Sequence, residues 1–187
     1  SSFVYNNSVT EQIYTSTEID GAGDIYSIAM YNAGYSDSYN SYLTDVIRMF
    51  DIYMVNTKKS SFNSGTDWVT DLTLVDRVFS GEVTLEYGTW TTIYLDDPFY
   101  YDGTGNLALI IHDYTGVTTT RHDFKTYAAG TNTAIYIGSV TGLDPINMSA
   151  SGTLLNEKNK IIINKENHTA SSYTVTANVT PEGSGTT

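Results

Sequence analysis

Two strand-forming segments and the turn between them, all within Gly88–Gly116, constrain the fold of this chain more than any other feature. Side chains from Trp90 to Leu95 alternate between two faces, as expected of a strand with one face in a core. The run from Leu107 to Ile111 is short and wholly apolar, which is typical of a strand covered on both sides. Pro98 predicts the end of the first strand because it has no N–H for a ladder, and Asp102–Asn106 predicts the turn. This stretch therefore predicts two β-strands at the centre of a β-domain.

Alternating or β-branched segments predict further strands along the chain. They are Glu11–Thr15, Ile25–Tyr31, Val46–Val55 (the longest), Glu82–Tyr87, Phe124–Tyr127, Ala134–Ile137 and Lys160–Asn164. Asn32–Thr44 and Lys58–Thr66 are predicted to be loops, and one helical turn is expected before Phe79. Asp51 is the one polar residue on its face of the strand Val46–Val55. Strands at this spacing, separated by turn signals, predict an all-β fold, an antiparallel β-sandwich of jelly-roll type.

Composition narrows the class of partner. The 187 residues include 21 Asp and Glu against 9 Lys and Arg, a net charge of −12, so the chain repels phosphate backbones and nucleic acid is not expected. Cys is absent, which excludes disulfides and thiolate metal sites. No apolar run reaches the ~20 residues of a transmembrane helix, so membrane insertion is not expected. Sixteen Tyr suit both a pleated sheet and a wet recognition surface.

Two units are predicted along the chain. Residues 1–165 form the β-sandwich, and residues 166–187 form a linker and the start of a following small β-module. The alternation from Tyr173 to Val179, followed by Pro181, predicts a strand that belongs to that next module. The chain is therefore expected to come from a multi-module protein.

Exposed aromatic side chains give the main indication of binding, because a ring can stack on a sugar while its polar atom hydrogen-bonds. The predicted ligand-binding residues are Tyr35, Tyr39, Tyr42, Trp68, Tyr100 and Tyr101. Burial of the Trp side chains in a core, and coverage of sheet faces by Tyr, is the alternative; for Trp90, on a strand, the core is favoured.

Oxygen-bearing side chains around the central turn suggest a calcium site. Asp102, Thr104 and Asn106 alternate as in the first half of an EF-hand loop, although Leu107 stands where its Gly would be. The predicted ligand set is Asp96, Asp97, Asp102, Thr104, Asn106 and Asp113. Turn chemistry explains the same residue types, so calcium is a prediction with a structural alternative.

No enzyme motif stands out. His112–Asp113 and His122–Asp123 resemble catalytic pairs, but neighbours on an extended strand point to opposite faces and cannot form the His–Asp bond of a triad. The chain contains neither G-x-S-x-G nor H-E-x-x-H. Catalysis is not expected, and a hydrolase built from dispersed carboxylates stays an alternative.

Several segments together resemble a β-rich, jelly-roll-like module of secreted and surface proteins of Bacteroidetes, found beside fibronectin type III and gingipain/haemagglutinin-type adhesin domains. These are Asp24–Tyr35, Arg48–Phe62, Trp68, Val78–Leu85 and Trp90–Gly116, of which WTTIYLDDPFYYDGTGNLALII and DIYMVNTKKSSF are the most specific. The resemblance covers roughly Glu11–Ile137. It implies a jelly-roll-like sandwich in a non-catalytic, adhesive or glycan-binding setting.

The leading prediction is a non-catalytic extracellular module of a bacterial surface protein that serves cell adhesion or carbohydrate binding. Its expected partners are a glycan, or a host or cell-surface protein, and the flanking modules of its own chain. Tyr and Trp rings would stack on sugars while Asp and Asn accept hydroxyl hydrogen bonds, and calcium would rigidify the loop Asp96–Asn106. The first alternative is a structural spacer that binds nothing.

Overall fold

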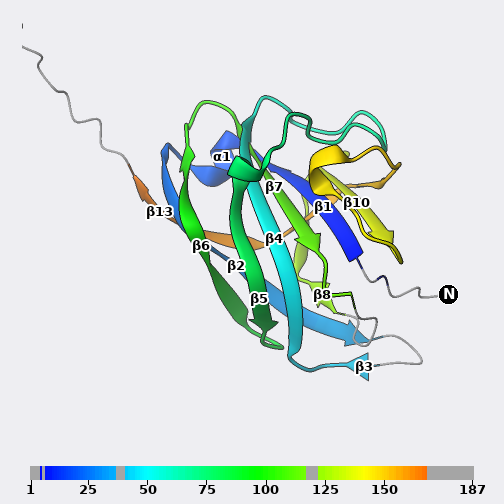
Figure 1. Cartoon of the computed structure of the whole chain (residues 1–187). Helices are drawn as coiled ribbons and strands as arrows, with labels where there is room; N and C mark the ends of the chain where they lie inside the picture. Colours follow the sequence, from blue (N-terminus) through cyan, green and yellow to red (C-terminus); the bar gives the residue numbers. More distant parts are fainter. Residues whose placement is uncertain (1–4, 6, 37–40, 117–121, 168–187) are drawn as a thin grey trace, which may run out of the picture.

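The protein is a β-sandwich of two stacked sheets (Figure 1), described by a computed structural model for residues 5, 7–36, 41–116 and 122–167. The larger sheet, sheet A, has the strand order β11-β10-β1-β7-β4-β5. Its strands are β1 (Asn7–Tyr14), β4 (Val46–Thr57), β5 (Arg77–Leu85), β7 (Asn106–Asp113), β10 (Ala134–Ser139) and β11 (Thr153–Leu155). All of its pairings are antiparallel, as predicted.

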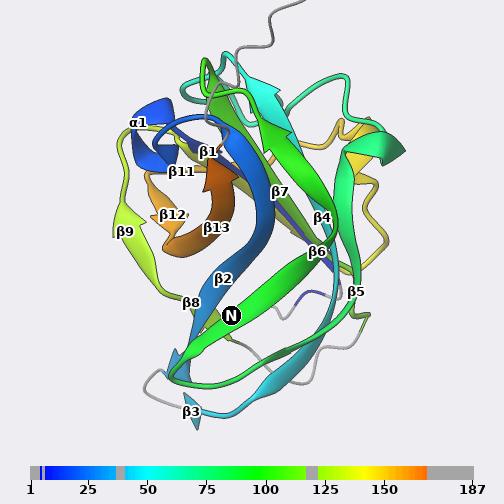
Figure 2. The ribbon, with the colours of Figure 1, turned by 90° about the vertical axis from the view of Figure 1, so that its left-hand side faces the viewer.

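The smaller sheet, sheet B, is built around β2, which pairs with all its other strands. These strands are β2 (Gly23–Ser36), β3 (Ser41–Tyr42), β6 (Trp90–Tyr101), β8 (Asp123–Phe124) and β13 (Ile161–Asn167). Figure 2 shows β2 and β6 in front of β4 and β7 of sheet A. The remaining elements are a small pair of strands, β9 (Thr126–Ala128) with β12 (Glu157–Asn159), and the short helices α1 (Ser16–Ile19), η1 (Leu74–Asp76) and η2 (Pro145–Asn147).

The main core lies between the two sheets. Sheet A contributes one face of β4, with Phe50, Ile52 and Met54, and sheet B contributes Ile28 and Ile93, which are paired across β2 and β6. These side chains are buried, and each faces inward because side chains alternate along a strand. Burial of this apolar surface is the main favourable term in folding.

Sheet A has a second apolar face, and loops cover it. Phe62, Trp68 and Val69 from the segment between β4 and η1 pack there against Ile110 of β7 and Ile135 of β10. Strand β7 is therefore buried on both sides, which confirms the prediction made from the apolar run at its centre. Glycine completes the cover: a Cβ on Gly152 would lie 2.7 Å from Cζ2 of Trp68.

Strand β6 continues through Pro98, so the prediction that proline ends the strand was wrong. Pro98 lies between Tyr94 and Phe99, the residues between which the register of β6 against β2 shifts. A proline is tolerated there because the irregularity already interrupts the ladder and because β6 pairs on one side only, with β2, among the described residues.

Other boundaries also differ from prediction. Strand β2 runs on to Ser36 into a stretch predicted as loop, and it, rather than β4, is the longest strand. The helical turn before Phe79 is present as η1. Strand β13 ends at Asn167, two residues beyond the predicted boundary, and the predicted strand Tyr173–Val179 lies outside the described residues. The structure confirms an all-β sandwich, while jelly-roll connectivity stays a prediction.

Candidate functional site

The outward face of sheet B carries large side chains that remain in contact with solvent. Ser27 pairs with Tyr94, Ala29 with Thr92 and Tyr31 with Trp90, so these residues share the face opposite to the core. Tyr94 is 74% exposed and Trp90 36%, which corrects the prediction that Trp90 is a core residue. Across β2, Ile162 of β13 is 43% exposed on the same face. We refer to Tyr31, Trp90, Tyr94 and Ile162 as the aromatic face.

Strand β2 contributes small residues to the middle of this face. Ser27 and Ala29 lie between the larger side chains of β6 and β13, and both are buried. Asn164 of β13 donates a hydrogen bond to Oγ of Ser27 at 2.8 Å. A groove of about 540 Å³ adjoins the face and is lined by Tyr14, Glu18, Ile19, Trp90, Tyr127, Lys160 and the three residues Ile161, Ile162 and Ile163. This volume lies within the range of small-ligand sites.

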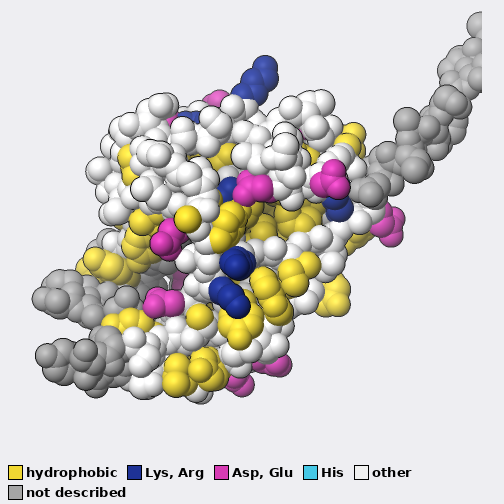
Figure 3. Space-filling model, turned by 180° about the vertical axis from the view of Figure 1, so that it is seen from behind, with side chains coloured by type: hydrophobic (Ala, Val, Ile, Leu, Met, Phe, Trp, Pro, Cys, Tyr) yellow, Lys and Arg dark blue, Asp and Glu magenta, His cyan; other side chains and the backbone are white. Residues whose placement is uncertain are grey.

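Tyr31, Trp90 and Lys125 contact one another in series at one end of the aromatic face. The Tyr31 and Trp90 rings meet edge-on, with centroids 5.6 Å apart and planes at 79°. Lys125 Nζ lies 4.8 Å from the centre of the Tyr31 ring, within cation–π distance. Backbone hydrogen bonds hold these segments together. The Lys125 amide donates to the Tyr31 carbonyl at 3.0 Å, and the Lys160 amide donates to the Lys125 carbonyl at 2.8 Å. Figure 3 shows hydrophobic side chains gathered around basic ones on the side that faces away in Figure 1.

Glu18, which lines the groove, forms an ion pair with the buried side chain of Lys158. Nζ of Lys158 lies 2.8 Å from Oε2 of Glu18 and donates to the Ile13 carbonyl at 2.7 Å. Tyr127 donates its hydroxyl to the same carboxylate. Burial raises the pKa of Glu18, but the hydrogen bonds from Lys158, Tyr127 and Thr15 outweigh it and lower the pKa to about 2. Glu18 is therefore a charged structural group at neutral pH and unsuited to act as a general acid.

The predicted ligand-binding residues are not brought together as one platform. Tyr35 and Tyr42 stack at 6.3 Å between β2 and β3, and Tyr100 is exposed on β6. Trp68 and Tyr101 are buried, which contradicts their predicted role: Trp68 donates Nε1 to the Ala150 carbonyl, and Tyr101 donates its hydroxyl to the Gly105 carbonyl. Tyr39 lies outside the described residues.

The predicted calcium ligands do not form one site either. Asp102 accepts hydrogen bonds from the amides of Thr104 and Gly105, as in a turn, and Asn106 accepts one from the Ser16 amide. Asp113 ends β7 at the opposite end from Asn106, roughly 23 Å away at ~3.3 Å per residue, so these two cannot share an ion.

The acidic residues of β6 are also separate from the turn. Asp96 accepts a hydrogen bond from the Ser80 amide, and Asp97 is exposed. Among the described residues, no three His, Asp or Glu side chains are arranged to hold a metal. The six-residue ligand set is therefore wrong as a single site, while a calcium ion held by some of these oxygens stays a prediction.

A cross-strand acidic–histidine pair was missed in the sequence. Asp51 of β4 is paired in register with His112 of β7, with Oδ2 3.7 Å from Nδ1, and Arg77 Nη1 lies 3.5 Å from Oδ1 of Asp51. Asp51 is also the register partner of Ser80, so the row runs Ser80, Asp51, His112. A triad needs the histidine between the serine and the aspartate, and this row has the aspartate in the middle. The polar position of Asp51 on an apolar strand was the signal for the pair.

The second histidine that the structure describes, His122, lies against an arginine. Arg48 donates Nε to Nδ1 of His122 at 3.3 Å, and it lies 3.8 Å from Asp113. Burial, followed by the Arg48 charge, lowers the pKa of His122 to about 3, so its ring is neutral at physiological pH. This arrangement positions Arg48 inside the sandwich rather than activating a nucleophile.

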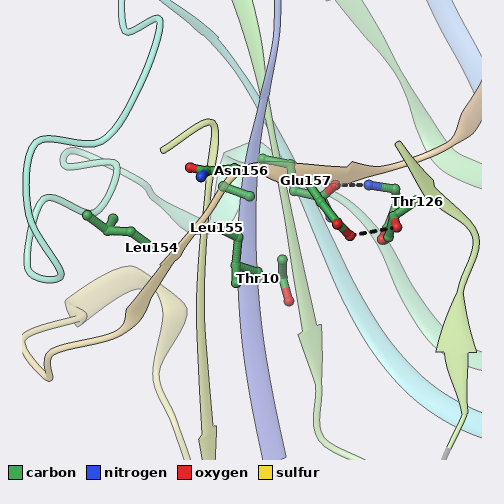
Figure 4. A pocket seen from close by; sticks show the side chains of 9 residues that line it. Thr10, Thr126, Leu154, Leu155, Asn156 and Glu157 are labelled. Carbon is green, nitrogen blue, oxygen red and sulfur yellow. Dashed lines mark hydrogen bonds between the residues drawn. The ribbon is translucent and has the colours of Figure 1, made fainter. Parts of the chain in front are cut away.

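A smaller hollow on the edge of sheet A has little chemical capacity. It measures about 290 Å³ and is lined by Thr10, Gln12, Thr126, Ala134, Leu154, Leu155, Asn156, Glu157 and Asn159. Figure 4 shows its one acidic side chain, Glu157, accepting a hydrogen bond from the Thr126 hydroxyl, at 2.9 Å. With no aromatic ring in its lining, it lacks the stacking surface that the aromatic face offers.

No protein-family model, curated protein or solved structure matches this chain. Among the described residues, no helix has the length and apolar character needed to cross a membrane.

Proposed function

We propose that this protein is a non-catalytic carbohydrate-binding and adhesion module, and that sugar rings stack on its aromatic face. The observation that carries the proposal is the pair of exposed rings, Trp90 and Tyr94, on the outward face of sheet B. A pyranose ring presents a flat patch of C–H groups that packs on an aromatic ring, while its hydroxyls hydrogen-bond at the edges.

The face is ordered before any ligand arrives. Trp90 and Tyr94 project from a β-strand whose inward neighbour, Ile93, is anchored in the core. The edge contact with Tyr31 restrains the Trp90 ring further. Rings held on a rigid element lose little conformational entropy on binding, so more of the contact energy appears as affinity. Asn164 and Thr92 lie beside the rings and can exchange hydrogen bonds with hydroxyls.

The wider setting of the proposal is extracellular. An acidic, cysteine-free β-sandwich with sixteen Tyr suits a module on a bacterial cell surface, and the resemblance to the Bacteroidetes jelly-roll-like module supports the same setting. We include in the proposal the jelly-roll connectivity, flanking modules in the parent chain and a calcium ion near the turn Asp102–Asn106. Melting temperatures with Ca²⁺ and with chelator test the ion: identical values end that part of the proposal.

A glycan array probed with the whole chain tests the function. We expect binding to a defined set of glycans and a loss of about tenfold or more in affinity for Trp90→Ala, because aromatic anchors dominate such interfaces. Trp90→Tyr keeps a ring at the same position and serves as the matched control, with a smaller loss. Circular dichroism melting of all three proteins excludes unfolding as the cause.

Two outcomes oppose the proposal. Silence across a broad array favours the alternative of a structural spacer that binds nothing. Binding that survives Trp90→Ala unchanged removes the aromatic face as the site.

A further inference from the structure

Some basic side chains of this acidic chain form ion pairs with carboxylates, and others do not. In the described part of the chain, several are neutralised by nearby carboxylates: Lys59 by Asp67, Arg77 by Asp51, and Lys158 by Glu18. Lys125 and Lys160 have no carboxylate within ion-pair distance among the described residues, although the chain carries 21 acidic residues. Both side chains are exposed, so neither charge has been removed from water.

These two lysines lie together beside the aromatic face. The Lys160 amide donates to the Lys125 carbonyl at 2.8 Å, and Lys125 covers the Tyr31 ring that contacts Trp90. Lys160 and Trp90 also line the same groove. Glu18 lines it too, but Lys158 and Tyr127 already occupy its carboxylate. Lys160 in the groove and Lys125 over the Tyr31 ring therefore place two positive charges beside the aromatic face, neither with a carboxylate partner among the described residues.

We infer that the ligand of the aromatic face is an anionic polysaccharide, in which one sugar ring stacks on Trp90 while its acidic groups lie near Lys125 and Lys160. This inference rests on the proposed function and specifies its substrate class. Charge complementarity between a lysine pair and the carboxylates or sulfates of such a polymer gives both selectivity over neutral glycans and faster encounter.

Nucleic acid is the other polyanion that combinations of rings and lysines recognise. The net charge of −12 opposes it, because a phosphate backbone must pass the acidic remainder of the surface whereas the lysine pair is a small patch. A polysaccharide can carry fewer than one charge per sugar, whereas every nucleotide of a strand carries a phosphate, so such a polymer places less charge against that surface.

Two pairs of polymers test the inference with the intact chain. Polygalacturonate is compared with its methyl ester, and dextran sulfate with dextran, so the members of each pair share a sugar backbone and only one of them is charged. We expect at least one charged member to bind about tenfold or more tightly than its neutral counterpart at low salt, with the difference shrinking as salt rises. Oligo(dT) is included as a polyanion without sugars of this kind.

Variants tie the effect to the site. Lys125→Gln and Lys160→Gln should each weaken binding of the charged polymer about threefold, and the double variant more, with binding of neutral polymers unchanged. Lys58→Gln removes the same charge from an exposed lysine elsewhere and should leave binding unchanged.

The outcomes separate the two proposals. Equal binding of charged and neutral members, lost in Trp90→Ala, overturns the anionic preference and leaves the proposed function standing. Oligo(dT) bound as tightly as polygalacturonate also overturns the inference. Absence of binding to every polymer here, combined with a silent glycan array, overturns the inference and the proposed function together.

Discussion

Each sheet of the sandwich has an outward face, and among the described residues the two faces differ in how far their large aromatic side chains are buried. On the outward face of sheet A, Trp68 is 2% exposed beneath the loop that carries it, while on sheet B Trp90 is 36% exposed. The residue type is the same, but its surroundings differ. Loops after β4 and around η2 convert the first face into a second core. On sheet B, Trp90 and Tyr94 keep part of their surface exposed in the described structure.

The difference separates two roles for aromatic surface. Rings in the second core contribute to folding through burial, at about 25 cal/mol per Å² of apolar area. Rings on the aromatic face contribute less because much of their surface stays in water, so that surface is available to a ligand. If this distinction is right, substitutions on the two faces should divide into those that affect stability and those that affect binding.

The largest effect is expected from Trp68→Ala, which empties the centre of the second core and breaks the bond from Nε1 to the Ala150 carbonyl. We expect the free energy of unfolding to fall by about 3–5 kcal/mol. Urea unfolding followed by tryptophan fluorescence from Trp90, and by circular dichroism, measures it. A loss below about 1 kcal/mol would mean that the cover contributes little and that the two faces are alike.

The second core also contains a buried carboxyl. Oε2 of Glu11 accepts the Val69 amide at 2.8 Å, and Oε1 has no hydrogen-bond partner among the described residues. Burial raises the pKa of Glu11 to about 7, against the opposing effects of the Val69 amide and Lys59, while Asp67 adds to the rise. The folded state therefore binds a proton more tightly than the unfolded state, whose pKa is 4.5.

Stability linked to Glu11 is consequently complete below pH 4.5 and is lost as pH rises through 7. Glu11→Gln carries no charge and keeps an acceptor for Val69, so it should remove this loss. Between pH 4.5 and pH 8, its unfolding free energy relative to wild type should rise by about 3 kcal/mol. Urea titrations at both pH values measure the change, with Glu82→Gln as the exposed control. Parallel pH curves for wild type and Glu11→Gln would contradict it.

A third prediction concerns the close packing of Gly152 against the loops that cover sheet A. A Cβ on Gly152 would lie 2.7 Å from Cζ2 of Trp68 and 2.9 Å from Cγ1 of Ile135, so Gly152→Ala should cost about 1–3 kcal/mol. At Gly142 the same Cβ would have no atom within 4 Å, so Gly142→Ala is the matched control and should be near neutral. Thermal melting of both variants gives the comparison. Equal melting temperatures would show that the cover is loosely packed.

Local sequence predicted the strands better than their surroundings. The apolar run Leu107–Ile111 reports burial on both faces by itself, and the alternation of Trp90–Leu95 correctly separates Ile93 from Trp90 and Tyr94. The alternation of side chains does not show which face of a sheet is covered by loops. The cover of sheet A comes from the polar-looking segment between β4 and η1, which is distant in sequence from β7. Trp68 and Trp90 were therefore assigned to the wrong environments.

Contacts that depend on strand pairing could not be predicted from local sequence patterns either. Asp51 stood out as a polar residue, but its partner His112 depends on the register of β4 against β7. The pairing of Lys125 with Lys160 depends in the same way on a hydrogen bond between segments that are distant in sequence. The turn at Asp102 was predicted correctly, whereas Asn106 already belongs to β7. Their grouping with Asp113 failed because β7 separates Asn106 from Asp113.

The smallest effect is expected on the aromatic face, where Trp90→Ala and Tyr94→Ala should each change the free energy of unfolding by no more than about 0.5–1 kcal/mol. The reason is that Tyr94 is 74% exposed and that Trp90 packs mainly edge-on against Tyr31. Urea unfolding under the conditions used for Trp68→Ala gives a direct comparison between the two tryptophans. A loss of 2 kcal/mol or more for Trp90→Ala would show that this ring supports the sheet as Trp68 does. In that case the exposed surface would be a by-product of packing, and the aromatic face would lose the distinction on which its role in binding depends.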